Sequence, residues 1–181
     1  MLAQMRHIAK TFAHGIHPPE HKESTSSLPI RRLPFSPELI VPLSQHTGAP
    51  AVPCVNEGQE VVRGEPIAKA GGFVSVPMHA PATGVVLGIE RRLGAKGDAI
   101  RSIVIRTYMG VSQEVLYGAA QNVDAMTPKE LIQAVQDTGV VGLGGDAFHT
   151  HVKLAVPEGR RIDTVIVNGC ECEPYLTTDH R

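Results

Sequence analysis

With 181 residues and a formal net charge of −1, the chain is long enough for one large domain or two small ones and carries little net charge. That balance gives no attraction to nucleic acid or to a membrane surface, and the lack of tryptophan disfavours a platform for stacked bases. No segment reaches the roughly 18 apolar residues of a membrane span, and the N-terminus does not read as a secretory signal. A cytoplasmic location is therefore the default prediction.

Residues 1–32 are predicted to form an extended arm. The pair Pro18-Pro19 excludes a helix interior, and the Ser/Thr/Pro segment Ser24–Pro29 indicates a linker. Three histidines lie around the prolines, at His14, His17 and His21. They could indicate a metal site, but the prolines keep the segment extended and no cysteine or aspartate is near. An arm that wraps a domain is the preferred interpretation.

Residues 33–107 are predicted to be a small all-β module, because short apolar runs recur at roughly ten-residue spacing. The runs are Leu39–Leu43, Glu60–Val62, Pro66–Ala70, Gly84–Ile89 and Ser102–Arg106. The patterns at Val55–Ala68 and His79–Val86 resemble the barrel-sandwich hybrid of biotinyl and lipoyl carrier domains. Those carriers have a modified lysine on the hairpin between the two patterns, whereas Ala70–Val76 has none at its tip. We therefore interpret the module as a scaffold and not as a swinging arm.

Residues 108–126 are predicted to connect this module to a helix. Thr127-Pro-Lys-Glu130 has the sequence of a capping box with proline at the first helical position. Gly139 stands where a left-handed glycine ends a helix. The expected apolar face consists of Leu131, Ile132 and Val135.

The segment Gly142–Lys153 combines glycines, one phenylalanine and one lysine. A glycine loop exposes backbone N–H groups to an anion, and a lysine adds a point charge. Because the loop follows a helix and not a strand, it is only a weak signal for the dinucleotide-binding fingerprint. Ile162–Val167 predicts a buried strand that would deliver Asn168–Tyr175 at its carboxyl end, where α/β folds bind ligands. The asparagine and two carboxylates of that segment complete a predicted pocket for a phosphorylated cofactor, a nucleotide or a flavin.

The predicted fold class is therefore α+β or α/β, with the all-β module at 33–107 and the start of an α/β cofactor-binding domain at 127–181. One strand and one helix do not make an α/β sheet, so the second part is expected to be incomplete or to pack on a partner. Cys170 and Cys172 are too close together for C-x-x-C spacing, and we expect both to be buried or packed without a redox role. No catalytic or metal-ligating residue is predicted.

Several separated motifs, in this order, resemble the N-terminal part of the RnfC family, also called RsxC. Members of that family are a subunit of the Rnf ion-translocating electron transport complex. The motifs are Gly15–Pro18, Pro29-Ile30 with Leu33-Pro34, Gln45–Pro50, the barrel-sandwich pattern, the glycine loop and Glu171–Tyr175. The second half is also similar to the NADH-binding flavoprotein subunit of respiratory complex I, which carries a similar glycine loop and an acidic segment around FMN and NADH.

The resemblance implies that NADH gives a hydride to FMN and that electrons then leave singly through 4Fe-4S clusters, which this chain lacks. It implies that the glycines line FMN, that the lysine neutralises its phosphate and that the phenylalanine stacks on the dinucleotide. The asparagine and the two glutamates would contact the ribityl chain, the flavin or the nicotinamide. The implied partners are the ferredoxin-like and membrane subunits of the complex, at the cytoplasmic face of the inner membrane. The implied binding residues are Gly142, Gly144, Gly145, Phe148, Lys153, Asn168, Glu171 and Glu173.

Two residues depart from the family pattern, since Asp146 replaces an alanine and His149 replaces a proline. A carboxylate that points into the loop should repel a phosphate. Two other functions stay open. One is a cofactor-free structural or assembly module that docks partner subunits and keeps a vestigial nucleotide site. The other is the related flavoprotein that reduces cobalamin in bacterial microcompartments.

Overall fold

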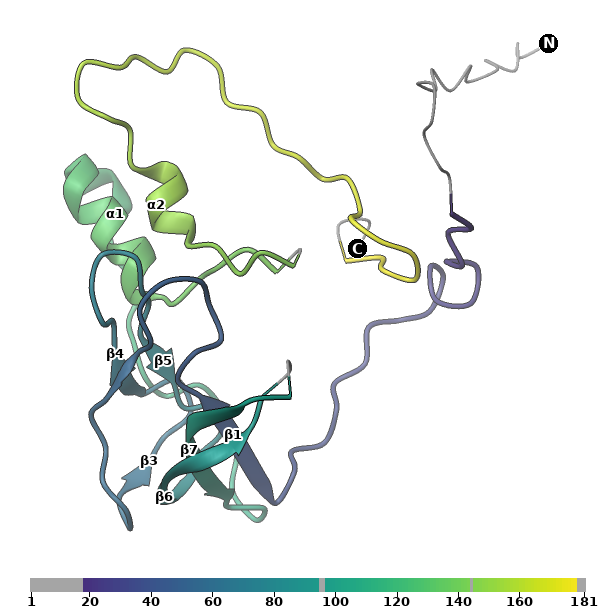
Figure 1. Ribbon diagram of the computed structural model, residues 1–181, viewed down its shortest axis with the longest axis vertical. Helices are drawn as coiled ribbons and strands as arrows, with labels where there is room; N and C mark the ends of the chain where they lie inside the picture. Colours follow the sequence, from purple (N-terminus) through teal and green to yellow (C-terminus); the bar gives the residue numbers. More distant parts are fainter. Residues whose placement is uncertain (1–17, 95–96, 144, 179–181) are drawn as a thin grey trace. The chain divides into compact units, whose positions relative to one another are not determined.

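The computed structural model describes residues 18–94, 97–143 and 145–178. The chain divides into two compact units, one of residues 1–31 with 164–181 and one of residues 32–163, and each is described by itself. Most of the predicted N-terminal arm, with His14 and His17, lies outside the described residues. The larger unit holds the strands and helices of the described residues, most of which are labelled in Figure 1.

Two antiparallel sheets form the β part of the larger unit. The first has four strands in the order β1 (Glu38–Pro42), β7 (Ala99–Thr107), β6 (Gly84–Leu93) and β3 (Glu60–Val61). The second has three strands in the order β2 (Val52–Pro53), β4 (Pro66–Lys69) and β5 (Met78–His79). The register between β6 and β7 shifts between Val86 and Gly88, and such a bulge bends a strand and increases its twist.

The hydrophobic core joins residues of both sheets. Its fully buried members include Ile67 of β4, Val86 of β6 and Ile105 of β7. Ile103, Val104 and Ile105 are all 0 % exposed. Successive side chains of a strand point to opposite faces, so β7 is covered on both faces. Burial of branched apolar side chains is thus the main source of stability in this module.

The all-β prediction is confirmed, and each of the five predicted apolar runs overlaps a strand. The two strands that the sequence did not reveal are β2 and β5, which are each two residues long. A strand this short shows no alternation of apolar and polar residues, so periodicity cannot detect it.

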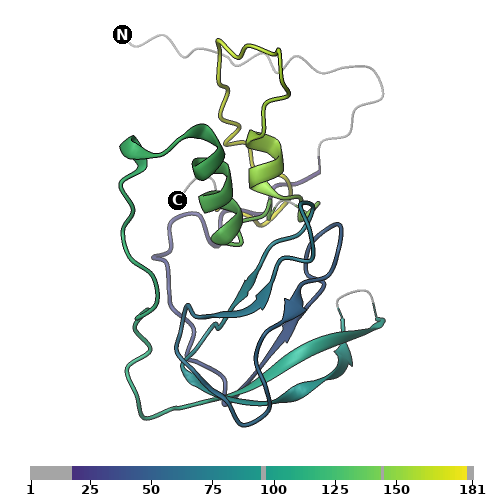
Figure 2. The same cartoon turned by 90° about the vertical axis from the view of Figure 1, so that its left-hand side faces the viewer.

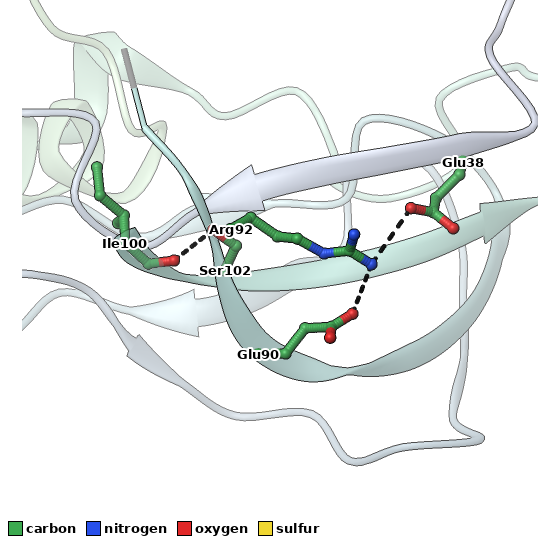
Figure 3. Close-up of polar contacts among 5 residues, drawn as sticks. All are labelled: Glu38, Glu90, Arg92, Ile100 and Ser102. Atoms are coloured by element: carbon green, nitrogen blue, oxygen red, sulfur yellow. Dashed lines mark hydrogen bonds and ion pairs between the residues drawn. The ribbon is translucent and has the colours of Figure 1, made fainter. Parts of the chain in front are cut away.

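A charged contact crosses the outer surface of the larger sheet (Figure 3). Arg92 of β6 lies 2.6 Å from Glu90 and 3.5 Å from Glu38 of β1, on the two sides of β7. The side chains are 36–52 % exposed, and ion pairs this accessible to water contribute little to stability. Beneath them, the buried Ser102 donates a hydrogen bond to Ile100 O at 3.1 Å.

The helical part follows β7 along the chain. A 3-10 turn, η1 (Val123–Ala125), precedes α1 (Pro128–Asp137), and α2 (Thr150–Leu154) comes last. Figures 1 and 2 show α1 and α2 side by side, next to the end of the barrel sandwich that carries β4 and β5. The predicted capping box is confirmed, since Thr127 and Glu130 bond reciprocally, and Gly139 has the expected left-handed φ of +76°.

One expectation about the segment after the β module is wrong, and another is met only in part. Ile162–Val167 forms no strand, and its apolar side chains are 60–89 % exposed. A strand needs neighbours to satisfy its backbone, and neither sheet of the described residues includes this segment. The expected apolar face of α1 is only partly covered, with Leu131 36 % exposed, whereas the buried residue of this fully described helix is Gln136.

Candidate cofactor-binding site

The glycine loop connects α1 to α2 as a closed turn. Val141 and His149 form an antiparallel bridge at its ends, and Gly142 N donates to Phe148 O at 2.8 Å. Gly145 has a φ of +107°, and Ala147 is left-handed at +48°. Gly144, which was also predicted to line the cofactor, lies outside the described residues. The described part of the loop therefore has a defined backbone with its strain concentrated at one non-glycine residue.

Gly142 lies beneath two charged groups of opposite sign. A Cβ built at this position would lie 2.8 Å from Asp146 Oδ1 and 3.1 Å from Lys153 Nζ. Only glycine therefore lets these groups approach the backbone so closely. Of the two groups, the lysine ammonium fits a phosphate, whereas the carboxylate repels one.

Lys153 projects from α2 toward the same position. Its Nζ lies 3.7 Å from Asp146 Oδ2 and 5.8 Å from the centroid of the Phe148 ring. The second distance is within the range of a cation–π contact. The lysine predicted to bind phosphate and the aromatic residue predicted to stack on the dinucleotide are thus neighbours in the structure.

Asp146 is ionised, and its carboxylate makes contacts within the loop. Its Oδ1 accepts a hydrogen bond of 3.0 Å from Phe148 N, and this bond together with the nearby Lys153 charge lowers the pKa of the Asp146 carboxyl. The sequence predicted that this carboxylate would repel a phosphate if it pointed inward. In the structure its Oδ2 lies 3.7 Å from Nζ of Lys153, the residue predicted to neutralise the phosphate.

The backbone of the loop is held by the barrel sandwich. Thr47, in the segment between β1 and β2, donates from Oγ1 to Asp146 O at 2.8 Å and from its N–H to Ala147 O at 3.3 Å. Both bonds go to main-chain atoms, so they do not depend on the Asp146 side chain. The all-β module therefore serves as a scaffold for the glycine loop.

Three buried histidines pack between the loop and the scaffold. The ring centroids of His46 and His149 are 5.0 Å apart, and those of His149 and His151 are 5.5 Å apart. His149 is 0 % exposed, and its ring nitrogens have no hydrogen-bond partner among the described residues. Burial, followed by the neighbouring imidazoles, lowers the pKa of His149, so the ring is neutral near pH 7. His149 and His151, which alternate beside the loop, are therefore packing residues of the interior.

The hairpin that carries the modified lysine in carrier domains is clamped by the helices. Gln136 donates to the carbonyls of Gly72, Phe73 and Ser75 at 3.2, 3.4 and 3.0 Å. His151 Nε2 lies 2.7 Å from Phe73 O and donates to it. Hydrogen bonds at three carbonyls hold this hairpin in place. This agrees with the interpretation of the module as a scaffold, which was based on the absence of a lysine at the tip of the hairpin. The sequence did not reveal the role of Gln136, because a glutamine in a helix is normally solvent-exposed.

The other predicted site residues belong to the smaller unit. Asn168 Oδ1 accepts a hydrogen bond from Cys170 N at 2.9 Å. Glu171 and Glu173 line a groove of about 230 Å³ together with Lys22, whose Nζ donates to Leu176 O at 2.8 Å. The seven predicted residues that the structure describes are therefore divided, with Gly142, Gly145, Phe148 and Lys153 in the larger unit and Asn168, Glu171 and Glu173 in the smaller one.

The two cysteines of the smaller unit correct a prediction. Cys170 and Cys172 are both exposed, whereas the sequence led us to expect burial or packing. The adjoining apolar run forms no strand, so no sheet of the described chain covers either side chain. Among the described residues, no group of three or more His, Cys, Asp or Glu side chains is placed to hold a metal ion.

Of two cavities in the described part of the larger unit, one borders the glycine loop. One of about 950 Å³ lies away from it and is lined by Arg32, Leu33, Phe35, Arg63, Ser112, Gln113, Glu114 and Val115. The other, of about 520 Å³, has Gly145, Asp146 and Ala147 on one wall. Its charged lining residues are Asp98 and Asp146, so it does not attract a phosphate. The cation near the loop is Lys153, on the Gly142 side.

The fold defines a class of protein, a barrel-sandwich scaffold followed by a helical segment with a glycine loop. Residues 10–109 match the RnfC barrel sandwich hybrid domain, and residues 135–181 match the Nuo51 FMN-binding domain. The first match covers more than half of the chain. The chain therefore belongs to the RnfC family, as its motifs predicted.

Individual relatives agree with this assignment, and each is the subunit designated C of its complex. The relative from the Na(+)-translocating ferredoxin:NAD(+) oxidoreductase complex of Acetobacterium woodii is 43 % identical over 173 residues, which cover 94 % of this chain and 38 % of that protein. Its proton-translocating counterpart in Clostridium ljungdahlii is 37 % identical over 176 residues, 96 % of this chain and 38 % of that protein. The relative from the ion-translocating oxidoreductase complex of Pseudomonas aeruginosa is 39 % identical over 170 residues, 93 % of this chain and 22 % of that protein.

The chain thus spans well under half the length of these relatives. In the described part of the chain, no helix has the length and hydropathy that a membrane crossing needs.

Proposed function

We propose that this chain contributes the FMN and NADH site of an Rnf-type oxidoreductase, as the N-terminal portion of its RnfC subunit. When bound, FMN would accept a hydride from NADH and would pass single electrons to 4Fe-4S clusters outside this chain. Three observations support the proposal. They are membership of the RnfC family, the match to an FMN-binding domain, and a glycine loop that carries both a lysine and an aromatic residue.

The observation that carries the proposal is the convergence of Gly142, Phe148 and Lys153. Lys153 would bind the phosphate, since an ammonium is a compact point charge for a phosphate. Gly142 would let the phosphate reach the backbone, because no Cβ is in the way. Phe148, half-buried beside the lysine, would cover one side of the ligand and exclude water. Each of these roles is one of binding and orientation.

Asn168, Glu171 and Glu173 are proposed to contact the ribityl chain, the flavin or the nicotinamide. Carboxylates and an amide oxygen accept hydrogen bonds from hydroxyl groups and ring N–H groups. The proposed partners are the ferredoxin-like and membrane subunits of an Rnf complex, at the cytoplasmic face of the inner membrane. The names of the relatives, which are subunits of ion-translocating oxidoreductase complexes, support the assignment to a complex of that kind.

A second function is favoured by one observation. Asp146 pairs with Lys153, so the loop already holds an anion of its own. If that pair excludes ligands, the chain acts as a cofactor-free structural module whose barrel sandwich docks partner subunits.

Flavin fluorescence distinguishes the two functions. FMN is titrated with the purified protein, and the proposed function predicts quenching at micromolar concentrations that is lost in Lys153→Ala. Lys129→Ala, which removes an exposed lysine of α1, is the matched control and should leave the quenching unchanged. Absence of quenching with the unmodified protein would favour the structural module.

A further inference from the structure

We propose that Asp146 is a built-in competing anion, which occupies the phosphate-binding donors of the glycine loop until a ligand phosphate displaces it. The inference rests on the proposed function and goes beyond it, because it assigns the control of affinity at that site to one side chain.

The carboxylate of Asp146 holds two donors that a phosphate would need. Its Oδ1 accepts from Phe148 N at 3.0 Å, and its Oδ2 lies 3.7 Å from Lys153 Nζ. Its Oδ1 also lies only 2.8 Å from the place of a Cβ on Gly142. The chain's own anion therefore lies over Gly142 and beside Lys153, the two residues that the proposed function assigns to the ligand phosphate.

The same geometry lets the carboxylate leave without unfolding the loop. The Asp146 side chain is 61 % exposed, and its Lys153 partner is 49 % exposed. The main chain is fixed separately, by Thr47 Oγ1 on Asp146 O and by the Gly142 N–H on Phe148 O. Among the described residues, rotation of the side chain into water breaks an exposed ion pair with Lys153 and the hydrogen bond to Phe148 N. Exposed pairs of this kind are weak.

A phosphate dianion carries more charge and more acceptor oxygens than one carboxylate, so it can displace Asp146 from Lys153. The displaced carboxylate remains on the same loop and still repels the phosphate through water. Asp146 therefore lowers affinity for ligands that carry a phosphate. It has no such effect on a ligand whose flavin ring is the same but whose phosphate is missing.

The test compares FMN with riboflavin, which lacks the phosphate, by fluorescence titration of the wild-type protein and Asp146→Asn. Removal of the competing charge should tighten FMN binding about three- to tenfold and leave riboflavin binding unchanged. Asp124→Asn removes an equal charge from an exposed position on η1 and is expected to change neither. A second readout needs no flavin: inorganic phosphate is titrated while the NMR signals of the Lys153 side chain are followed, and Asp146→Asn should again bind more tightly.

The outcomes separate this inference from the proposed function. If wild type binds FMN and Asp146→Asn binds it no more tightly, the competing-anion role is wrong and the FMN site stands. If no variant binds FMN but inorganic phosphate binds Lys153 more tightly in Asp146→Asn, the competing-anion role stands and the flavin assignment is wrong. If neither FMN nor phosphate binds any variant, both are wrong.

Discussion

The side-chain amide of Gln136 in α1 donates a hydrogen bond of 3.0 Å to the carbonyl of Ser75, which lies 61 positions earlier in the chain. The same amide also reaches the carbonyls of Gly72 and Phe73. A polar residue of α1 thus attaches the helix to the barrel sandwich. This contact fixes the hairpin against the element that leads into the glycine loop.

Gln136→Ala should lower the free energy of unfolding by about 1–3 kcal/mol, because it leaves a buried carbonyl without its donor. Urea denaturation followed by circular dichroism measures the change. Gln121→Ala, at an exposed connector position, is the matched control and should change the unfolding free energy by less than about 0.5 kcal/mol. Equal denaturation midpoints for the two variants would show that the clamp does not hold α1 in place.

Stability should depend on pH through His149. Burial lowers the pKa of His149 in the folded state below its unfolded value of about 6.5, so the unfolded state binds the proton more readily. The contribution of neutral, buried His149 to the free energy of unfolding is therefore complete above about pH 6.5, and it is lost as the pH falls below that value. His149→Leu replaces the titratable imidazole by an apolar side chain of similar volume and should reduce the loss of stability between about pH 7.5 and pH 5.5. Denaturation at both pH values tests this, and identical pH dependence in both proteins would contradict it.

The N-terminus of α1 should depend on Thr127. Its side chain accepts from Glu130 N at 3.3 Å, and Glu130 Oε2 accepts from Thr127 N at 2.8 Å. Thr127→Ala should lower the unfolding free energy by about 1 kcal/mol, and Thr127→Ser should restore most of it, since serine is an equally good cap. Thermal unfolding measures both variants. A Ser variant as unstable as the Ala variant would mean that the threonine methyl group, and not the hydroxyl, is responsible.

Two glycines near the loop should respond differently to alanine. At Gly139 the φ is +76° and a Cβ would lie 2.9 Å from Pro77 O, a main-chain atom that cannot move easily, so Gly139→Ala should cost about 1 kcal/mol or more. At Gly142 the nearest atoms are the ends of the Asp146 and Lys153 side chains, which can swing away. Gly142→Ala should therefore nearly retain stability and weaken FMN binding. Paired measurements of unfolding and FMN affinity test the contrast, and the reverse pattern would contradict it.

The sequence predicted the parts of the fold that depend on local signals. Apolar runs located β1, β3, β4, β6 and β7, and the Thr127–Glu130 pattern located the start of α1. These signals are complete within a few residues of chain. The Ile162–Val167 run shows where they fail, because a strand also needs partner strands, and no strand of the described residues pairs with it.

The sequence predicted which residues belong to the candidate site, but it did not predict how they are arranged in space. Motif spacing selected Gly142, Phe148 and Lys153, and the structure brings these three together. The ion pair of Asp146 with Lys153 was not expected, since the distance between two residues of a loop depends on the backbone path. The support from Thr47 was also missed, because that residue lies 99 positions from Asp146 and long-range contacts leave no periodic trace.

The most direct test of the central claim is the contribution of the ligand phosphate to binding, measured as the ratio of riboflavin to FMN dissociation constants. The proposed site predicts that FMN binds the wild-type protein more tightly than riboflavin, because Lys153 neutralises the phosphate. Lys153→Met keeps the length of the side chain without its charge and should bring the ratio close to one by weakening FMN alone. Equal binding of FMN and riboflavin to the wild-type protein, or an unchanged ratio in Lys153→Met, would contradict the assignment of this loop as the phosphate site.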